Sequence, residues 1–303
     1  MLSFKNISIA LGIFLVLLFS ADYYLHYRLP QAFNTEGYRG EILGDKEGNE
    51  YRIACFGGST TFGYLLNKDE SYPFYLQHEL AEKGNFTVAN LGANGQGIYG
   101  ISHDVEYYDY LQYDAAILYD GYNDRNPKDF NLSNFRGGDL LFSAFGYKTI
   151  LWFYLKDKYT LWNTPENIVS KPVFDKRNPN SVALKNTLSK YFTENDSLAQ
   201  TLYLNNKKPY GEYLNYLEQT LTYLSTNNIK TFYVCQPKSY NSIQQKLVRQ
   251  LIAQKFKGKV KYISLSDAIE NMDDFSFDSM HLTAEGNRKI AKMMKDSVLS
   301  YLK

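Results

Sequence analysis

The sequence predicts an α/β domain built on a parallel sheet of five strands. Two observations support this prediction: short apolar runs alternate with amphipathic helical stretches, and the first three runs each end in a turn that contains glycine. Such alternation is typical of βαβ units, whose strands lie parallel in one sheet. The expected strands are 51–56, 86–90, 115–119, 231–235 and 260–264, and the expected helices are 71–82, 101–111, 210–226, 242–256 and 283–302.

The composition limits the classes of partner. The chain has 303 residues, of which 44% are hydrophobic, and 33 basic residues stand against 32 acidic ones. This balance gives no indication of a nucleic-acid partner. The 28 tyrosines suit contact with carbohydrate or a membrane interface, and a biased composition without function is the alternative. Cys55 and Cys235 stand in apolar runs, so we expect core thiols, no metal and no cofactor.

The N-terminus predicts contact with a membrane. Residues 7–21 are almost wholly apolar and follow Lys5, and the tyrosines after them extend the stretch to about Leu25. A full span needs about 20 residues, and a signal peptide needs a small residue where Phe19 stands. We therefore interpret residues 1–27 as an uncleaved transmembrane anchor, with membrane contact through 7–25 and the rest of the chain outside the cytoplasm. A secreted protein after signal cleavage is the alternative.

The rest of the chain divides into a connector and one domain. Residues 28–50 are polar and contain several glycines, which is typical of a connector, and the domain spans 51–303. The alternation of strands and helices stops in residues 125–207, which we interpret as an inserted helical lid. Its aromatic stretch, 140–162, could also meet a membrane. A structural cap without a role in substrate binding is the alternative.

The segment 52–63 carries the first candidate site residue. An apolar run ends in Gly57-Gly58 and is followed by Ser59, which places one hydroxyl at the carboxyl edge of the sheet, where ligands bind in open α/β sheets. Taken alone, this turn is equally compatible with a nucleophile, a phosphate-binding loop or a plain connection.

Later residues make a nucleophile the preferred interpretation. Asp278 and His281 precede the last predicted helix, and a Ser-His-Asp set performs nucleophilic catalysis. The backbone amides of Ser59 and Gly95, with the side-chain amide of Asn123, are candidates for an oxyanion hole. Asp120 is expected to end a strand, and Asp124 is expected to pair locally with Arg125.

Four sequence blocks resemble the SGNH/GDSL hydrolases. They are Gly57-Gly-Ser-Thr-Thr-Phe-Gly63, Asn90-Leu-Gly-Ala-Asn-Gly95, Gly121-Tyr-Asn-Asp124 and Asp278-Ser-Met-His281, with Gly58 where the commonest form has aspartate. The segment Asn34-Thr-Glu-Gly-Tyr-Arg-Gly40 is similar to one in membrane-anchored bacterial members. The resemblance implies a flavodoxin-like three-layer α/β/α sandwich. It also implies an esterase whose roles fall on Ser59, Gly95, Asn123, Asp278 and His281.

The expected function is hydrolysis of carboxylic esters, with the O-acetyl groups of a cell-surface polysaccharide as the suggested substrate. An O-acetyltransferase would use the same acyl-enzyme and is the first alternative. A non-catalytic flavodoxin-like protein that binds phosphate, or an inactive scaffold, is the alternative from another class. That alternative leaves Asp278 and His281 without a role.

Overall fold

The computed structural model describes most of the chain outside the predicted insertion. The described residues are 4–28, 33–34, 36–64, 66–121, 123–124, 149, 151, 211–237, 243–265, 269, 272–276 and 280–302. The predicted insertion, 125–207, lies outside them except for Thr149 and Leu151, so its role as a lid stays a prediction.

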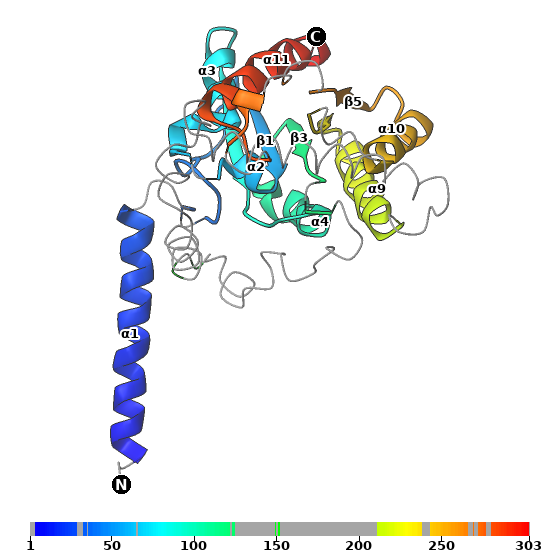
Figure 1. Cartoon of the computed structure of the whole chain (residues 1–303). Helices are drawn as coiled ribbons and strands as arrows, with labels where there is room; N and C mark the ends of the chain where they lie inside the picture. The colour runs from blue at the N-terminus through cyan, green and yellow to red at the C-terminus, as the bar shows by residue number, and fades with distance from the viewer. Residues whose placement is uncertain are drawn as a thin grey trace, which may run out of the picture.

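Five parallel strands form one sheet in the order β2-β1-β3-β4-β5, which confirms the predicted α/β fold (Figure 1). The chain moves from β1 outward to β2 and then returns to place β3 on the other side of β1. This reversal makes the carboxyl ends of β1 and β3 the place where such folds bind ligands. The strands are β1 (Tyr51–Gly57), β2 (Phe86–Gly92), β3 (Ala115–Tyr119), β4 (Lys230–Val234) and β5 (Val260–Ile263).

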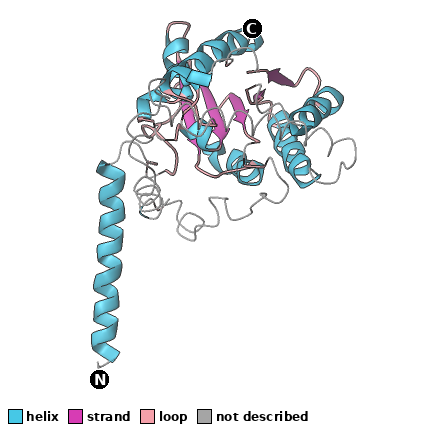
Figure 2. Cartoon of the chain, in the orientation of Figure 1, coloured by secondary structure: helices cyan, strands magenta, loops and turns pink. Residues whose placement is uncertain are grey.

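Helices cover both faces of the sheet because side chains alternate along each strand (Figure 2). Ala54 and Phe56 of β1 pack on one side, whereas Ile53 and Cys55 pack on the other. The first side is covered by α4 (Ile98–Tyr107), α9 (Gly211–Thr226) and α10 (Ile243–Lys255), and the second by α3 (Tyr72–Ala81) and α11 (Ala284–Leu302). The result is the expected three-layer sandwich.

The strand ends agree with prediction to within two residues, but the helix expected at 101–111 is shifted. It begins at Ile98, since the Asp124 carboxylate accepts the Ile98 N–H at 2.8 Å and provides an N-terminal hydrogen-bond partner that a local pattern does not contain. Its last turn, Tyr108–Leu111, is a 3₁₀ helix (η2).

Part of the expected connector packs into the domain. Tyr38 is 1% exposed and belongs to the same core as Phe56. Its hydroxyl accepts the Leu43 N–H at 2.6 Å. The next residue, Arg39, donates its backbone N–H to the Asn90 carbonyl at 3.0 Å. Residues 38 and 39 therefore join the end of β2 rather than span open solvent.

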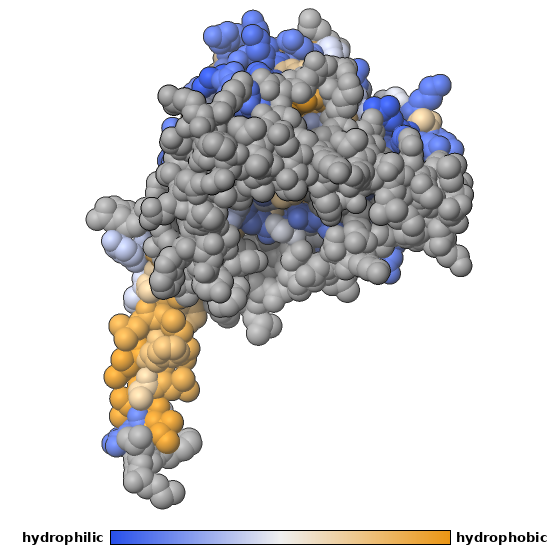
Figure 3. Space-filling view, in the orientation of Figure 1, coloured by the Kyte–Doolittle hydropathy of each residue, from blue (hydrophilic) through white to orange (hydrophobic). Residues whose placement is uncertain are grey.

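The helix α1 (Phe4–Arg28) projects from the domain and presents an apolar surface (Figures 1 and 3). Its stretch Lys5–Leu25 is long and apolar enough to cross a membrane, with a mean hydropathy of 1.9, as an anchor or a signal sequence would be. Asp22 is buried and accepts the Leu151 N–H at 2.7 Å, and Leu25 packs against the apolar cluster of Phe33, Phe62 and Ala93. The end of α1 thus contacts the domain.

Candidate active site

Ser59 lies where the sequence places it, at the carboxyl end of β1. The strand breaks at Gly57-Gly58, and Ser59 opens the four-residue helix α2 (Ser59–Phe62). The N–H groups of Phe62 and Gly63 donate to the carbonyls of Gly58 and Ser59, each at 3.0 Å, and close this single turn. The hydroxyl is thereby held at the sheet edge beside the switch between β1 and β3.

His281 reaches Ser59 from the other end of the chain. Its Nε2 lies 2.7 Å from the Ser59 Oγ, although the residues are 222 positions apart. His281 is 6% exposed and Ser59 8%, so water competes little for this contact. The ring of Tyr64 stands 4.9 Å from the imidazole, centroid to centroid, and forms an aromatic wall beside it. This distance is within hydrogen-bond reach, which is the geometry that a serine nucleophile and its general base require.

Backbone hydrogen bonds to residues 274–276 position His281. Phe275 and Leu282 form an antiparallel bridge, and the Ser276 N–H donates to the His281 carbonyl at 2.7 Å. Thr283 then opens α11, since its Oγ1 accepts the Gly286 N–H at 3.2 Å, as an N-cap does. The backbone of residues 281–283 is therefore held against residues 274–276, which fixes the point from which the His281 side chain reaches Ser59.

Gly95 and Asn123 lie on the same edge as Ser59. Gly95 has a φ of +75° within a turn closed by the Gln96 N–H on the Ala93 carbonyl, a conformation that favours glycine. The Asn123 amide nitrogen donates to the Gln96 carbonyl at 2.7 Å, which leaves its second N–H for another acceptor. No described residue accepts the backbone N–H of Ser59 or Gly95.

Gly58 is the position where the commonest form of the SGNH/GDSL hydrolases, which the sequence resembles, carries aspartate. A Cβ at this position would stand 2.6 Å from the Asn123 amide nitrogen and 2.9 Å from the Gln96 carbonyl. The missing side chain therefore lets the Asn123 turn approach the start of α2, where Ser59 lies.

Asp278, the predicted third member of the set, lies outside the described residues. The nearby Asp274 has a different task, because its carboxylate pairs with Lys289 at 2.8 Å and its carbonyl accepts the Thr283 N–H at 2.8 Å. Among the residues that the structure describes, no group of three or more His, Cys, Asp or Glu side chains is placed to hold a metal ion.

Two buried carboxylates, Asp120 and Asp124, lie on either side of Asn123 in the sequence. Burial raises the pKa of Asp120 to about 6, while the Tyr213 hydroxyl, a donor at 3.1 Å, opposes the rise. Burial first, and the charge of Asp120 second, raise the pKa of Asp124 to about 7. Asp120 ends its strand as predicted. Asp124 caps α4, and its expected partner Arg125 lies outside the described residues.

Asp124→Asn is expected to reduce the loss of stability at rising pH. Because the folded-state pKa is raised above the ordinary 3.8, the folded protein binds the extra proton between about pH 4 and pH 7, and the free energy of unfolding falls as pH rises through this range. Asparagine still offers an oxygen to the Ile98 N–H but does not ionise. Thermal unfolding of both proteins should show a Tm gain for the variant that is larger at pH 8 than at pH 5. An equal gain at both pH values would contradict this assignment.

Sequence reasoning missed Arg39 and Gln96 as parts of the site's support. Arg39 lies in a segment expected to be a connector, although the resemblance of 34–40 to anchored proteins was a signal that it could carry a role. Gln96 contributes only its backbone carbonyl to Asn123, and a backbone contact of this kind leaves no mark on residue type.

The sequence matches no protein-family model and no curated protein. Among solved structures, the chain is similar to a psychrotrophic esterase, EstA from Pseudoalteromonas sp., with 13% identity and a TM-score of 0.47 over 83% of this chain and 98% of that one. It is similar to AlinE4, an SGNH-hydrolase family esterase, with 17% identity and a TM-score of 0.41 over 85% of this chain and 100% of that one.

A third similar structure is a catalytic mutant of Axe2, an acetylxylan esterase from Geobacillus stearothermophilus. It is 12% identical, with a TM-score of 0.44 over 84% of this chain and 96% of that one. These solved structures are esterases.

Proposed function

We propose that this protein is a serine esterase that removes small acyl groups from esters. The observation that carries the proposal is the 2.7 Å contact between the His281 Nε2 and the Ser59 Oγ at the carboxyl edge of the sheet. A plain strand-to-helix connection or a phosphate-binding loop gives no reason for a buried histidine to reach this hydroxyl. A nucleophile that must lose its proton gives that reason.

The reaction would proceed in two steps. His281 accepts the Ser59 proton as the Oγ attacks the ester carbonyl, and it then gives that proton to the departing alcohol. An acyl group remains on Ser59 until a water molecule attacks its carbonyl and gives a proton to the same imidazole. The imidazole then returns this proton to the Ser59 Oγ as the bond between the Oγ and the acyl carbon breaks and the acid leaves. Each bond that breaks is thus matched by a proton transfer through one side chain.

Three donors are proposed to stabilise the oxyanion of each tetrahedral intermediate. They are the backbone N–H groups of Ser59 and Gly95 and the free amide N–H of Asn123, for which no described acceptor competes. One such donor contributes about 3 kcal/mol to lowering the barrier. Asp278 is proposed to orient the imidazole through its other nitrogen.

The proposed location is outside the cytoplasm, on an uncleaved anchor. The contacts of Asp22 with Leu151 and of Leu25 with the apolar cluster that contains Phe33 and Phe62 support retention of α1, because cleavage after residue 21 would leave both side chains at a new chain end. The proposed substrates are acetyl esters of carbohydrate at the cell surface. The half-buried Tyr64 ring beside His281 suits such a substrate, since an aromatic face packs well against a sugar ring or a short acyl group.

The test uses a fluorophosphonate probe, which reacts with activated serines, on the full chain in detergent micelles. We expect labelling of the wild type on the peptide that contains Ser59, none in Ser59→Ala, and acetate release from an aryl acetate that follows the same pattern. A membrane-impermeant probe should also label the protein on intact cells. A folded wild type that neither reacts with the probe nor releases acetate would overturn the proposal.

A further inference from the structure

The described residues of 33–40, which are 33–34 and 36–40, lie beside α2, the short helix that carries Ser59, and are called the hook below. The Asn34 side-chain oxygen accepts the N–H groups of Glu36 and Tyr38 at 3.0 and 3.2 Å, which folds the hook on itself. Arg39 forms bridges with Phe33 on one side and with Asn90 of β2 on the other. The backbone of the hook is therefore held against the sheet, independently of the contacts that the Arg39 side chain makes.

The Arg39 guanidinium binds the carboxyl end of α2. It donates from Nη1 to the carbonyls of Phe62 and Gly63, the latter at 2.8 Å, and from Nη2 to the Leu66 carbonyl at 2.7 Å. The guanidinium carbon also lies 4.4 Å from the centre of the Phe62 ring. Arg39 is only 3% exposed, so a full positive charge is buried where three carbonyl oxygens converge.

Burial of this charge costs free energy of hydration, which an exposed arginine keeps. Burial lowers the pKa of Arg39 to about 10, and the charges of Glu70 and Asp69 oppose this shift. Arg39 is still a cation at neutral pH, and a cation is favoured at the negative, carboxyl end of a helix.

The helix α2, which carries Ser59, needs such a partner because it has only four residues. A helix of one turn is not stable by itself, since its first hydrogen bond fixes several residues. The Ser59 carbonyl accepts the N–H groups of Gly63 and Tyr64 at 3.0 Å each, and Arg39 holds the carbonyl of the same Gly63. The Ser59 carbonyl is thus tied to the guanidinium through two successive peptide units, Phe62–Gly63 and Gly63–Tyr64, whose N–H groups reach Ser59 and whose carbonyls reach Arg39.

We infer that Arg39 is a positioning residue, which holds α2 so that the Ser59 Oγ stays within reach of His281. This inference rests on the proposed esterase function. Arg39 touches neither the nucleophile nor the base, and it acts through the carbonyls at the end of their supporting turn. The hook also joins α1 to α2, since the Phe33 and Phe62 rings lie 5.2 Å apart, centroid to centroid, in a small apolar cluster against which Leu25 of α1 packs.

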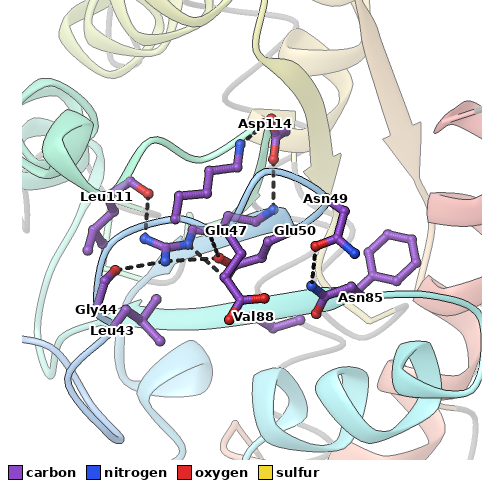
Figure 4. Close-up of polar contacts among 12 residues, drawn as sticks. Leu43, Gly44, Glu47, Asn49, Glu50, Asn85, Val88, Leu111 and Asp114 are labelled. Carbon is purple, nitrogen blue, oxygen red and sulfur yellow. Dashed lines mark hydrogen bonds and ion pairs between the residues drawn. The ribbon is translucent and has the colours of Figure 1, made fainter.

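A second buried arginine provides the matched control. Arg52 is 5% exposed and also donates to backbone carbonyls, of Leu111 at 3.0 Å and of Gly44 at 2.8 Å, and to the Glu50 carboxylate at 2.8 Å. Figure 4 labels these three partners. It stands near the amino end of β1, at the opposite end of the strand from Ser59. Loss of Arg52 should therefore affect stability without affecting the nucleophile.

The experiment compares the wild type with Arg39→Gln, Arg39→Lys and Arg52→Gln as full chains in micelles, well below each Tm. We expect Arg39→Gln to lower kcat for an aryl acetate by about 100-fold with KM within about twofold, because small misplacements of a reacting group carry losses of that order. Arg39→Lys should recover about tenfold of that loss. Arg52→Gln should lower Tm while kcat stays within about twofold of the wild type. Unchanged kcat in Arg39→Gln, or equal losses in both glutamine variants, would overturn the inference.

Hydrogen exchange separates this inference from the proposed function. Deuterium uptake in peptides covering residues 58–66 should rise in Arg39→Gln and stay at the wild-type level in Arg52→Gln. A wild type without esterase activity would end the proposed function, and the uptake would still report whether Arg39 holds the turn. Unchanged uptake in a folded Arg39→Gln variant would end the inference. Should Arg39→Gln not fold, the same two readings are taken on Arg39→Lys, where intermediate values are expected.

Discussion

His281→Ala is expected to lower kcat for an aryl acetate by about 10⁴- to 10⁶-fold, the range in which removal of one member of a nucleophile–base set falls. The Ser59 Oγ would keep its place on α2 but lose the nitrogen 2.7 Å away that takes its proton. Because the two side chains would act as one unit, the double variant Ser59→Ala/His281→Ala should lose about as much activity as either single variant.

The matched control is His103→Ala. His103 is exposed on α4 and packs its ring against Tyr99. Its loss should leave kcat within about twofold, as surface substitutions away from a site do. Steady-state kinetics on the wild type and the four variants, Ser59→Ala, His281→Ala, the double variant and His103→Ala, measure all of these effects. Losses that add in the double variant, or a His281→Ala enzyme with more than about a tenth of wild-type activity, would contradict the assigned roles.

Gly92→Ala is expected to destabilise the protein by about 3 kcal/mol or more, at the upper end of what overpacking causes. Gly92 ends β2 directly against α2, where a new Cβ would overlap the Phe62 backbone nitrogen and stand 2.8 Å from the Thr61 carbonyl carbon. These are backbone atoms, which cannot move away by a change of rotamer as the end of a flexible side chain can. The helix α2 would have to shift.

The comparison for this variant is Gly48→Ala. A Cβ on Gly48 meets nothing within 4 Å, and its backbone angle is one that alanine adopts. Thermal unfolding should show a fall in Tm of roughly 10 °C for Gly92→Ala, at 2–4 °C for each kcal/mol, and little change for Gly48→Ala. The same Tm in both variants would mean that β2 and α2 are not in close backbone contact.

Local pattern was sufficient for the strands of this protein. Alternating side chains such as Ile53 and Phe56 must reach opposite faces of the sheet, so the period of the sequence indicates the strand directly. Boundaries were less predictable where a distant residue sets them. The helix α4 begins three residues early because Asp124, 26 positions later, accepts the Ile98 N–H.

For the site, the sequence determined which residue types follow each strand and the last loop: Ser59, Gly95, Asn123 and His281. Parallel strands bring their carboxyl ends to one edge, so the order of elements alone predicted that these residues would gather. Only the tertiary structure decided that the His281 nitrogen meets the Ser59 hydroxyl and that the Arg39 hook, expected as a connector, supports the turn. The physical reason is twofold. The contact between His281 and Ser59 depends on how distant parts of the chain pack in three dimensions. The contacts of Arg39 are made to backbone carbonyls, which every residue has, so the amino-acid sequence does not indicate which carbonyls they are.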